Sequence, residues 1–115
     1  MTFEEAIKIT EEDFELIKDA PHTRLVRTGL TYDGAKGFCV MLYDKGDRAI
    51  ITDCGETKEV FDEVTEDEWK KLCKENGTEF NRWRIEKDFN GIEDLYEYIK
   101  FIDMISDKFF LADED

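Results

Sequence analysis

The chain has 115 residues, a length that predicts one domain with a single core. Acidic residues outnumber basic ones by 30 to 16, and the net charge of −14 predicts repulsion from DNA, RNA and anionic lipid. The sequence contains neither an apolar signal segment nor an apolar run of about 18 residues. We therefore expect a cytoplasmic protein in which residues 1–115 form a single domain and Asp113–Asp115 fray.

A helix-capping pattern opens the chain. Thr2 is followed three residues later by Glu5, which is the spacing of a capping box. Residues of one helical face then recur in steps of three and four, namely Phe3, Ile7, Thr10, Phe14 and Ile17. We predict a helix that ends before Pro21, or two short helices if Thr10 and Asp13 start a second one.

The pattern changes to that of β-strands between Arg24 and Asp53. Short runs rich in β-branched and aromatic residues are separated by turn clusters at Tyr32–Gly34 and Asp44–Asp47. The second cluster predicts a β-hairpin with a four-residue loop that joins strands at 38–43 and 48–52. The first of these strands is apolar on both faces, which predicts a central position. We expect a three-stranded antiparallel meander.

Helical signals follow Gly55. Thr57 is expected to cap a short helix that reaches about Glu63, and Thr65 with Glu68 forms a second capping box. The inward stripe and the stop signal of this second helix are predicted at Trp69, Leu72, Cys73 and Asn76–Gly77.

A polar strand and a long helix complete the predicted fold. Phe80, Trp83 and Ile85 indicate the strand, which we place at a sheet edge. The helix begins near Asn90 and Glu93, and its apolar stripe is Ile92, Leu95, Tyr96, Ile99, Ile102, Ile105 and Phe109. The predicted class is α+β: an antiparallel sheet of three to four strands packed by an N-terminal helix, two short middle helices and a long amphipathic C-terminal helix.

The acidic residues are concentrated in one segment. Residues 53–68 contain eight carboxylates and one lysine, a net charge of −7. Carboxylates in the first turn of a helix complement its dipole by about 0.3–1 kcal/mol each, but Asp62 and Glu63 lie near a predicted helix end. We predict a partner-binding acidic surface made of Asp53, Glu56, Glu59, Asp62, Glu63, Glu66, Asp67, Glu93 and Glu97. The alternative is that the acidity serves only solubility.

A basic segment follows the acidic one. Its cations are Lys70, Lys71, Lys74, Arg82, Arg84 and Lys87. Arg82 and Arg84 alternate with Trp83 and Ile85 and are expected to share one strand face. We expect these cations to pair with the surplus carboxylates of the chain, although a nucleic-acid patch with Trp83 as the stacking residue is the alternative.

The candidate catalytic residues are few. The single histidine, His22, lies in a connection and is expected to be solvated. Cys39 and Cys73 occupy apolar positions and are expected to be buried, reduced thiols. Cys54 lies between two acidic residues with no obvious cation beside it, which makes it a poor nucleophile. No zinc-ligand set and no glycine-rich phosphate loop occur, so we expect neither a metal nor a cofactor.

One metal-binding pattern remains open. Asp53, Glu56 and Lys58 are similar in type, though not in placement, to the carboxylates and the lysine with which some nucleases hold Mg²⁺. In such sites the Glu-x-Lys pair lies on a neighbouring strand, whereas here it runs into a helix start. We expect instead that Asp53 accepts backbone N–H bonds at the turn.

The stretch Thr52-Asp53-Cys54-Gly55-Glu56-Thr57, with the order of elements around it, resembles a family of small uncharacterised bacterial and prophage domains. The resemblance covers 24–110 and rests on this one motif, a strand-to-helix turn of the type T-D-x-G-E-T. It implies a fold and a phage or mobile-element setting, and it implies no catalytic residues.

These observations lead to three hypotheses of function. The first is a non-enzymatic acidic binding protein, similar to phage inhibitors of the anti-CRISPR or antirestriction type, that occupies a basic nucleic-acid-binding surface of a host protein in the host cytoplasm. The second is a metal-dependent nuclease that uses Asp53, Glu56 and Lys58. The third is a structural domain that forms a homodimer through an aromatic surface of Trp83, Tyr96, Tyr98, Phe101 and Phe110.

Overall fold

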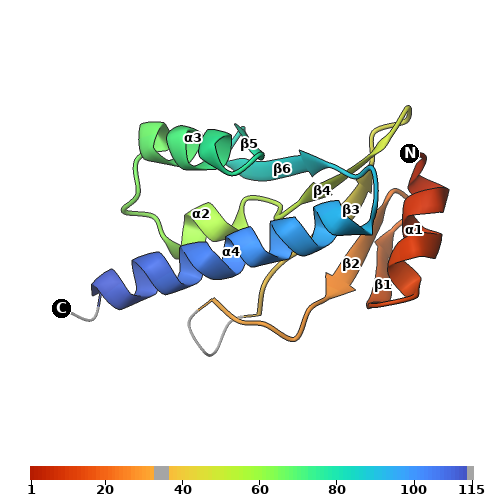
Figure 1. The fold of residues 1–115 in the computed structure, drawn as a ribbon, viewed down its shortest axis with the longest axis horizontal. Coiled ribbons are helices and arrows are strands. Elements are labelled where there is room, and N and C mark those ends of the chain that lie inside the picture. The colour runs from red at the N-terminus through yellow and green to blue at the C-terminus, as the bar shows by residue number, and fades with distance from the viewer. Residues whose placement is uncertain (33–36, 114–115) are drawn as a thin grey trace.

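The computed structural model describes residues 1–32 and 37–113, in which one antiparallel sheet of six strands packs against four helices (Figure 1). The elements in chain order are α1 (Phe3–Glu11), β1 (Glu15–Ala20), β2 (Thr23–Arg27), β3 (Met41–Asp44), β4 (Ala49–Thr52), α2 (Glu56–Val60), α3 (Glu66–Glu75), β5 (Glu79–Asn81), β6 (Arg84–Asp88) and α4 (Ile92–Asp113). The spatial strand order is β1-β2-β3-β4-β6-β5. The α+β class is confirmed, but the prediction of three to four strands is too low.

The predicted meander is present as β2, β3 and β4. Leu42 of β3 pairs with Arg24 on one side and with Ile51 on the other, both in antiparallel register. Residues 45–48 form the hairpin loop, one residue later than predicted, and the N–H of Lys45 donates to the carbonyl of Arg48 at 2.9 Å. Of the other predicted turn, Asp33 and Gly34 lie outside the described residues.

The N-terminal segment is shorter as a helix than predicted. The capping box at Thr2 is confirmed, but α1 ends at Glu11, and Ile17 lies in β1. β1 forms a hairpin with β2, in which Ile17 pairs with Leu25. The prediction that Phe14 and Ile17 continue the helix is therefore wrong. Pairing with β2 satisfies the backbone of residues whose apolar spacing also fits a helix.

The second difference is a hairpin where one edge strand was predicted. Arg82 and Trp83 have φ angles of 50° and 70° and form the two-residue turn between β5 and β6. Two left-handed residues in such a turn match the right-handed twist of the strands. β6 pairs with β4 inside the sheet, and of these two strands β5 is the one at an edge. Arg82 and Arg84 consequently do not share a strand face.

The helices lie on one side of the sheet and share one core with it. Figure 1 shows α4 running along this layer, with α1 near its N-terminal end and α2 and α3 toward its C-terminal half. The fully buried residues of α4 include Leu95, Tyr98, Ile102 and Ile105. Tyr96, predicted for this stripe, is 48% exposed instead. The apolar stripe is therefore rotated toward Tyr98.

The middle helices differ in how well they match the prediction. α3 begins at its predicted cap, where the hydroxyl of Thr65 accepts the N–H of Glu68 at 3.2 Å, and Trp69 and Cys73 are buried. α2 is not capped by Thr57, which is buried, and its N-cap position is Gly55 with a φ of 81°.

Two further expectations concern the chain end and the membrane. Asp113 is the last residue of α4, whereas Glu114 and Asp115, also expected to fray, lie outside the described residues. None of the helices in the described ranges is both long enough and apolar enough to cross a lipid bilayer.

Candidate functional site

Asp53 connects the end of β4 to both α2 and β6. Its side chain is 0% exposed, and its carboxylate accepts three backbone N–H bonds. The donors are Gly55 at 2.9 Å, Ile85 at 3.0 Å and Thr57 at 3.3 Å. The carboxylate thus supplies the acceptor that a capping side chain would give α2, whose N-cap glycine has none. The expectation that Asp53 accepts backbone N–H bonds at this turn is confirmed.

The burial of Asp53 removes it from the predicted acidic surface. Burial raises the pKa of this carboxyl above its ordinary value, while the hydrogen bonds from Gly55, Thr57 and Ile85 act in the opposite direction. A side chain with no exposed area cannot contact a partner. Asp53 is therefore a structural residue of the strand-to-helix turn.

The nuclease hypothesis requires Asp53, Glu56 and Lys58 to share a metal site. The Nζ atom of Lys58 lies 4.6 Å from the centroid of the Trp83 ring, a cation–π contact. Glu56 is half-buried. Within the described ranges, no group of three or more histidine, cysteine or acidic side chains is placed to hold a metal ion. The described residues therefore contain no preassembled metal site that would support the nuclease hypothesis.

Most of the predicted acidic residues gather around the connection between α2 and α3. We call this group the acidic end, and it consists of Glu59, Asp62, Glu63, Glu66, Asp67 and Glu68, all of which are exposed. The sequence places Glu68 both in the acidic segment and in the predicted capping box with Thr65. Glu66 forms an ion pair with Lys70 at 3.3 Å. The other members add to a surface of high negative charge density.

A cleft of about 260 Å³, lined by both carboxylates and apolar side chains, opens within the acidic end. Its walls are Val60, Phe61, Asp62, Glu63, Val64, Glu68 and Phe109. The ring of Phe109, from the C-terminal half of α4, lies 5.8 Å from that of Phe61. Three carboxylates therefore stand beside aromatic and aliphatic walls. Sequence reasoning missed the cleft because one wall comes from a helix far along the chain.

Glu93 and Glu97 do not join the acidic end. They lie in the first turns of α4, whereas Phe109, at the acidic end, follows Glu93 by 16 residues, or about 24 Å of helix. The carboxylate of Glu97 binds Lys87 at 2.7 Å, and this hydrogen bond lowers the pKa of Glu97. The predicted surface is thus divided into two separate groups.

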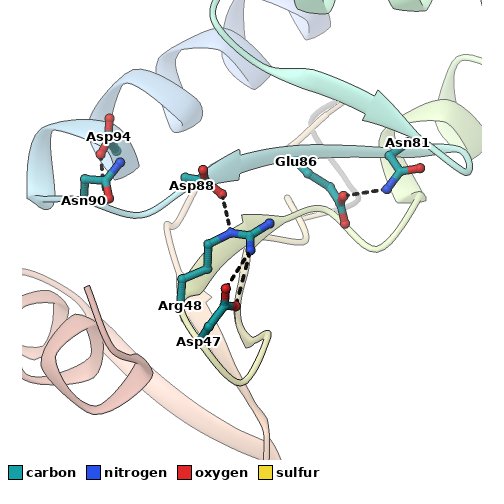
Figure 2. Close-up of polar contacts among 7 residues, drawn as sticks. All are labelled: Asp47, Arg48, Asn81, Glu86, Asp88, Asn90 and Asp94. Atoms are coloured by element: carbon teal, nitrogen blue, oxygen red, sulfur yellow. Dashed lines mark hydrogen bonds and ion pairs between the residues drawn. The ribbon is translucent and has the colours of Figure 1, made fainter.

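A larger polar groove of about 520 Å³ lies along β6 and the hairpin loop of β3 and β4. Arg48 donates to Asp88 at 3.1 Å and to Asp47 at 3.3 Å (Figure 2). In the same groove Asn81 donates to Glu86 at 3.1 Å. These charged groups are paired with one another, so the groove does not concentrate one sign of charge. None of these residues was singled out from the sequence as a ligand site.

The basic segment is partly neutralised within the chain, as expected. In addition to the Lys70 pair, Lys87 contacts Glu97, and Nε of Arg84 lies 3.9 Å from the carboxylate of Glu86. Ion pairing of this kind lowers the charge that the segment could offer to nucleic acid.

The aromatic surface proposed for a homodimer is not formed as predicted. Tyr98 is 0% and Phe101 is 5% exposed, so both belong to the core. Trp83 and Tyr96 are about half exposed but have different neighbours, since Trp83 contacts Phe80 and Tyr96 contacts Phe14. The side chain of Phe110 lies outside the described residues.

The histidine and the cysteines occupy varied environments. His22 lies in the turn between β1 and β2, where its side chain is 72% exposed and Nδ1 is 3.7 Å from the Asp44 carboxylate. All three cysteines fall in the described ranges and are reduced. Cys73 is buried as expected, Cys39 is half-buried, and Cys54 is exposed.

The resemblance to small bacterial and prophage domains rests on the Thr52–Thr57 motif, and the phage setting stays a prediction. Comparisons of the chain with protein-family models, with curated proteins and with solved structures found no match.

Proposed function

We propose that the chain is a non-enzymatic binding protein whose acidic end receives a lysine or arginine side chain from a basic protein surface. The observation that carries this proposal is the cleft in which Asp62, Glu63 and Glu68 stand beside apolar side chains. Carboxylates alone would indicate only a solvated surface. A cleft lined by both carboxylates and apolar side chains can accommodate the charged head and the apolar stem of a long cationic side chain.

Lysine and arginine each carry an aliphatic stem that packs against apolar surface and a cationic head that prefers polar partners. In the cleft, Val60, Phe61 and Val64 offer apolar contacts for the stem. Asp62 and Glu63 are exposed at its edge, where they can pair with the head. The net charge of −14 would steer a basic partner toward the chain before contact.

The partner class follows from the same chemistry. Proteins that bind DNA or RNA present clustered lysine and arginine side chains, because each phosphate contact requires a cation. The acidic end would occupy such a surface by placing carboxylates where phosphates bind, and so compete with nucleic acid. An anti-CRISPR or antirestriction role would be one case of this competition, and it stays a prediction.

The test uses variants with equal charge change at two places. Asp62→Asn, Glu63→Gln and Glu68→Gln are combined to neutralise the cleft. The control combines Glu4→Gln, Glu11→Gln and Glu12→Gln, three exposed residues of α1 and its C-cap. Fluorescence anisotropy then measures binding of a labelled arginine- and lysine-containing peptide, with an acidic peptide as the negative probe.

We expect the cleft variant to lose affinity by at least about tenfold and the control by less than about threefold. Binding should also weaken as salt rises, because the pairs are solvent-accessible. Equal losses of affinity in the two variants would mean that only the net charge matters, and this would contradict the proposal. Affinity that does not change with salt would contradict it too.

The second measurement addresses the partner class. A DNA-binding protein that the chain captures should release its labelled DNA when the chain is added, and should retain the DNA when the cleft variant is added. Simultaneous binding of chain and DNA would show that the carboxylates do not stand in for phosphates.

A further inference from the structure

Two cysteines face each other beyond the ends of β3 and β4. Met41 pairs with Thr52 in antiparallel register. Cys39 lies two residues before Met41, and Cys54 lies two residues after Thr52, so continuation of the register places the two cysteines opposite each other. The flanking Val40 is a fully buried core residue, whereas Cys39 and Met41 alternate with it and lie on the other side of the sheet.

The sulfur atoms of these residues are in contact. Sγ of Cys54 lies 3.1 Å from Sδ of Met41, and the thiols of Cys39 and Cys54 are hydrogen-bonded. Three sulfur atoms from two chain segments therefore converge, with Cys54 exposed and Met41 buried. A ligand could therefore reach the sulfur atoms from solvent at Cys54 and be enclosed by the protein at Met41.

The backbone at Cys54 adds an independent observation. Its φ of 57° is left-handed, a conformation that costs a residue with a Cβ atom about 1–2 kcal/mol. The next residue, Gly55, is also left-handed, with a φ of 81°. Strained residues persist where the surrounding structure holds them, and they concentrate at functional sites.

We propose that Cys39, Met41 and Cys54 form a binding site for one soft monovalent metal ion of the Cu(I) type. Two thiolates and a thioether are donors that select Cu(I) over the harder divalent ions. If metal–sulfur bonds are about 2.3 Å long, as for thiolate on zinc, three sulfur atoms in a plane around the ion are about 4 Å apart. Sγ of Cys54 and Sδ of Met41, which now lie 3.1 Å apart, would separate by about 1 Å to reach this arrangement.

Binding exchanges protons for the metal. Cu(I) forms bonds to both sulfur atoms of the thiols, each thiol releases its proton to solvent, and the Met41 thioether donates a lone pair without losing an atom. No electron is transferred, so the oxidation states of copper and sulfur do not change. Affinity should rise with pH, because the thiols must lose their protons.

The third sulfur atom favours a metal over a disulfide. Sδ of Met41 lies 3.1 Å from Sγ of Cys54, and a disulfide between the two cysteines would leave this thioether without a role.

The experiment is an anaerobic titration of the reduced chain with Cu(I) in the presence of a coloured Cu(I) chelator, with the stoichiometry checked by native mass spectrometry. Cys54→Ser is the main variant, since residue 54 is exposed and its loss should leave the fold intact. Met41→Leu keeps volume and apolar character but removes the thioether sulfur. Cys73→Ala is the matched control, because Cys73 is a buried residue of α3 and lies outside the site.

We expect one Cu(I) per chain, loss of at least about a hundredfold in affinity for Cys54→Ser and about tenfold for Met41→Leu, and no change for Cys73→Ala. Circular dichroism of each variant verifies the fold. Failure of the wild-type chain to hold one equivalent, or an equal loss in Cys73→Ala, would overturn the proposal. Formation of a Cys39–Cys54 disulfide with the thiol oxidant diamide, combined with unchanged Cu(I) affinity in Met41→Leu, would assign the thiols to a redox pair and reject the metal site.

Discussion

The carboxylate of Asp53 accepts the backbone N–H of Ile85 at 3.0 Å, which ties the turn after β4 to β6. The carbonyl of the same Ile85 accepts the hydroxyl of Tyr98, from α4, at 2.6 Å. A side chain from the turn after β4 and a side chain from α4 thus hydrogen-bond the N–H and the carbonyl of one core residue. Because all of these groups are buried, we expect the stability of the fold to depend strongly on them.

Replacement of Asp53 by alanine should be among the most destabilising single changes in the chain. It leaves the N–H groups of Gly55, Thr57 and Ile85 without their acceptor. Each unsatisfied buried donor costs about 1–3 kcal/mol, so we expect a loss of at least about 3 kcal/mol. Urea denaturation measures the change, with Asp62→Ala as an exposed control that should stay within about 0.5 kcal/mol. Similar values for both variants would contradict the structural role of Asp53.

The stability of the wild-type chain relative to Asp53→Asn should depend on pH. Burial raises the pKa of Asp53, so the folded state holds this proton more tightly than the unfolded chain does. The resulting stabilisation is complete below the unfolded pKa of about 3.9 and is lost as pH rises through the higher folded value.

Asparagine has no such proton, so the free energy of unfolding of Asp53→Asn relative to wild type should increase as the pH rises from about 4 to about 7. Urea denaturation at several pH values measures this difference. A difference that is constant with pH would show that Asp53 titrates alike in the folded and unfolded states.

Gly55→Ala should cost more than Gly29→Ala, although both glycines are left-handed. Their φ angles are 81° and 74°, so each substitution carries a similar backbone cost of about 1–2 kcal/mol. An added Cβ at Gly55 would lie 3.1 Å from the carbonyl oxygen of Trp83, whereas one at Gly29 meets no atom within 4 Å. We expect a further loss of about 1 kcal/mol or more at Gly55, because a backbone group must move. Equal melting-temperature shifts for the two variants would argue against this close approach.

Tyr98→Phe and Tyr96→Phe remove the same atom from opposite faces of α4. The Tyr98 hydroxyl is buried, and its loss leaves the Ile85 carbonyl unsatisfied, which should cost about 1–3 kcal/mol. The Tyr96 hydroxyl donates to Asp13 at 3.0 Å on the surface, and its loss should cost less than about 0.5 kcal/mol. Thermal unfolding of the two variants measures the contrast, and the reverse order would contradict the observed orientation of α4.

Local signals in the sequence account for much of the fold. The capping box at Thr2 and the N-cap at Thr65 mark the starts of α1 and α3, and the turn at residues 45–48 sets the hairpin of β3 and β4. Gly55 is also predictable as a joint, because a left-handed position between a strand and a helix favours glycine. Each of these features depends on residues that are neighbours along the chain.

Contacts between distant segments determine the rest. Residues 15–20 have a spacing that fits a helix as well as a strand, and pairing with β2 selects the strand. The turn at Arg82 and Trp83 contains no glycine or asparagine, and its left-handed backbone is accepted because β6 pairs with β4. Charge patterning located the acidic segment, but a carboxylate is exposed or buried according to what packs over it. Asp53 is consequently enclosed by Ile85 and α2, whereas Asp62 and Glu63 border a cleft that exists only because Phe109 of α4 reaches it.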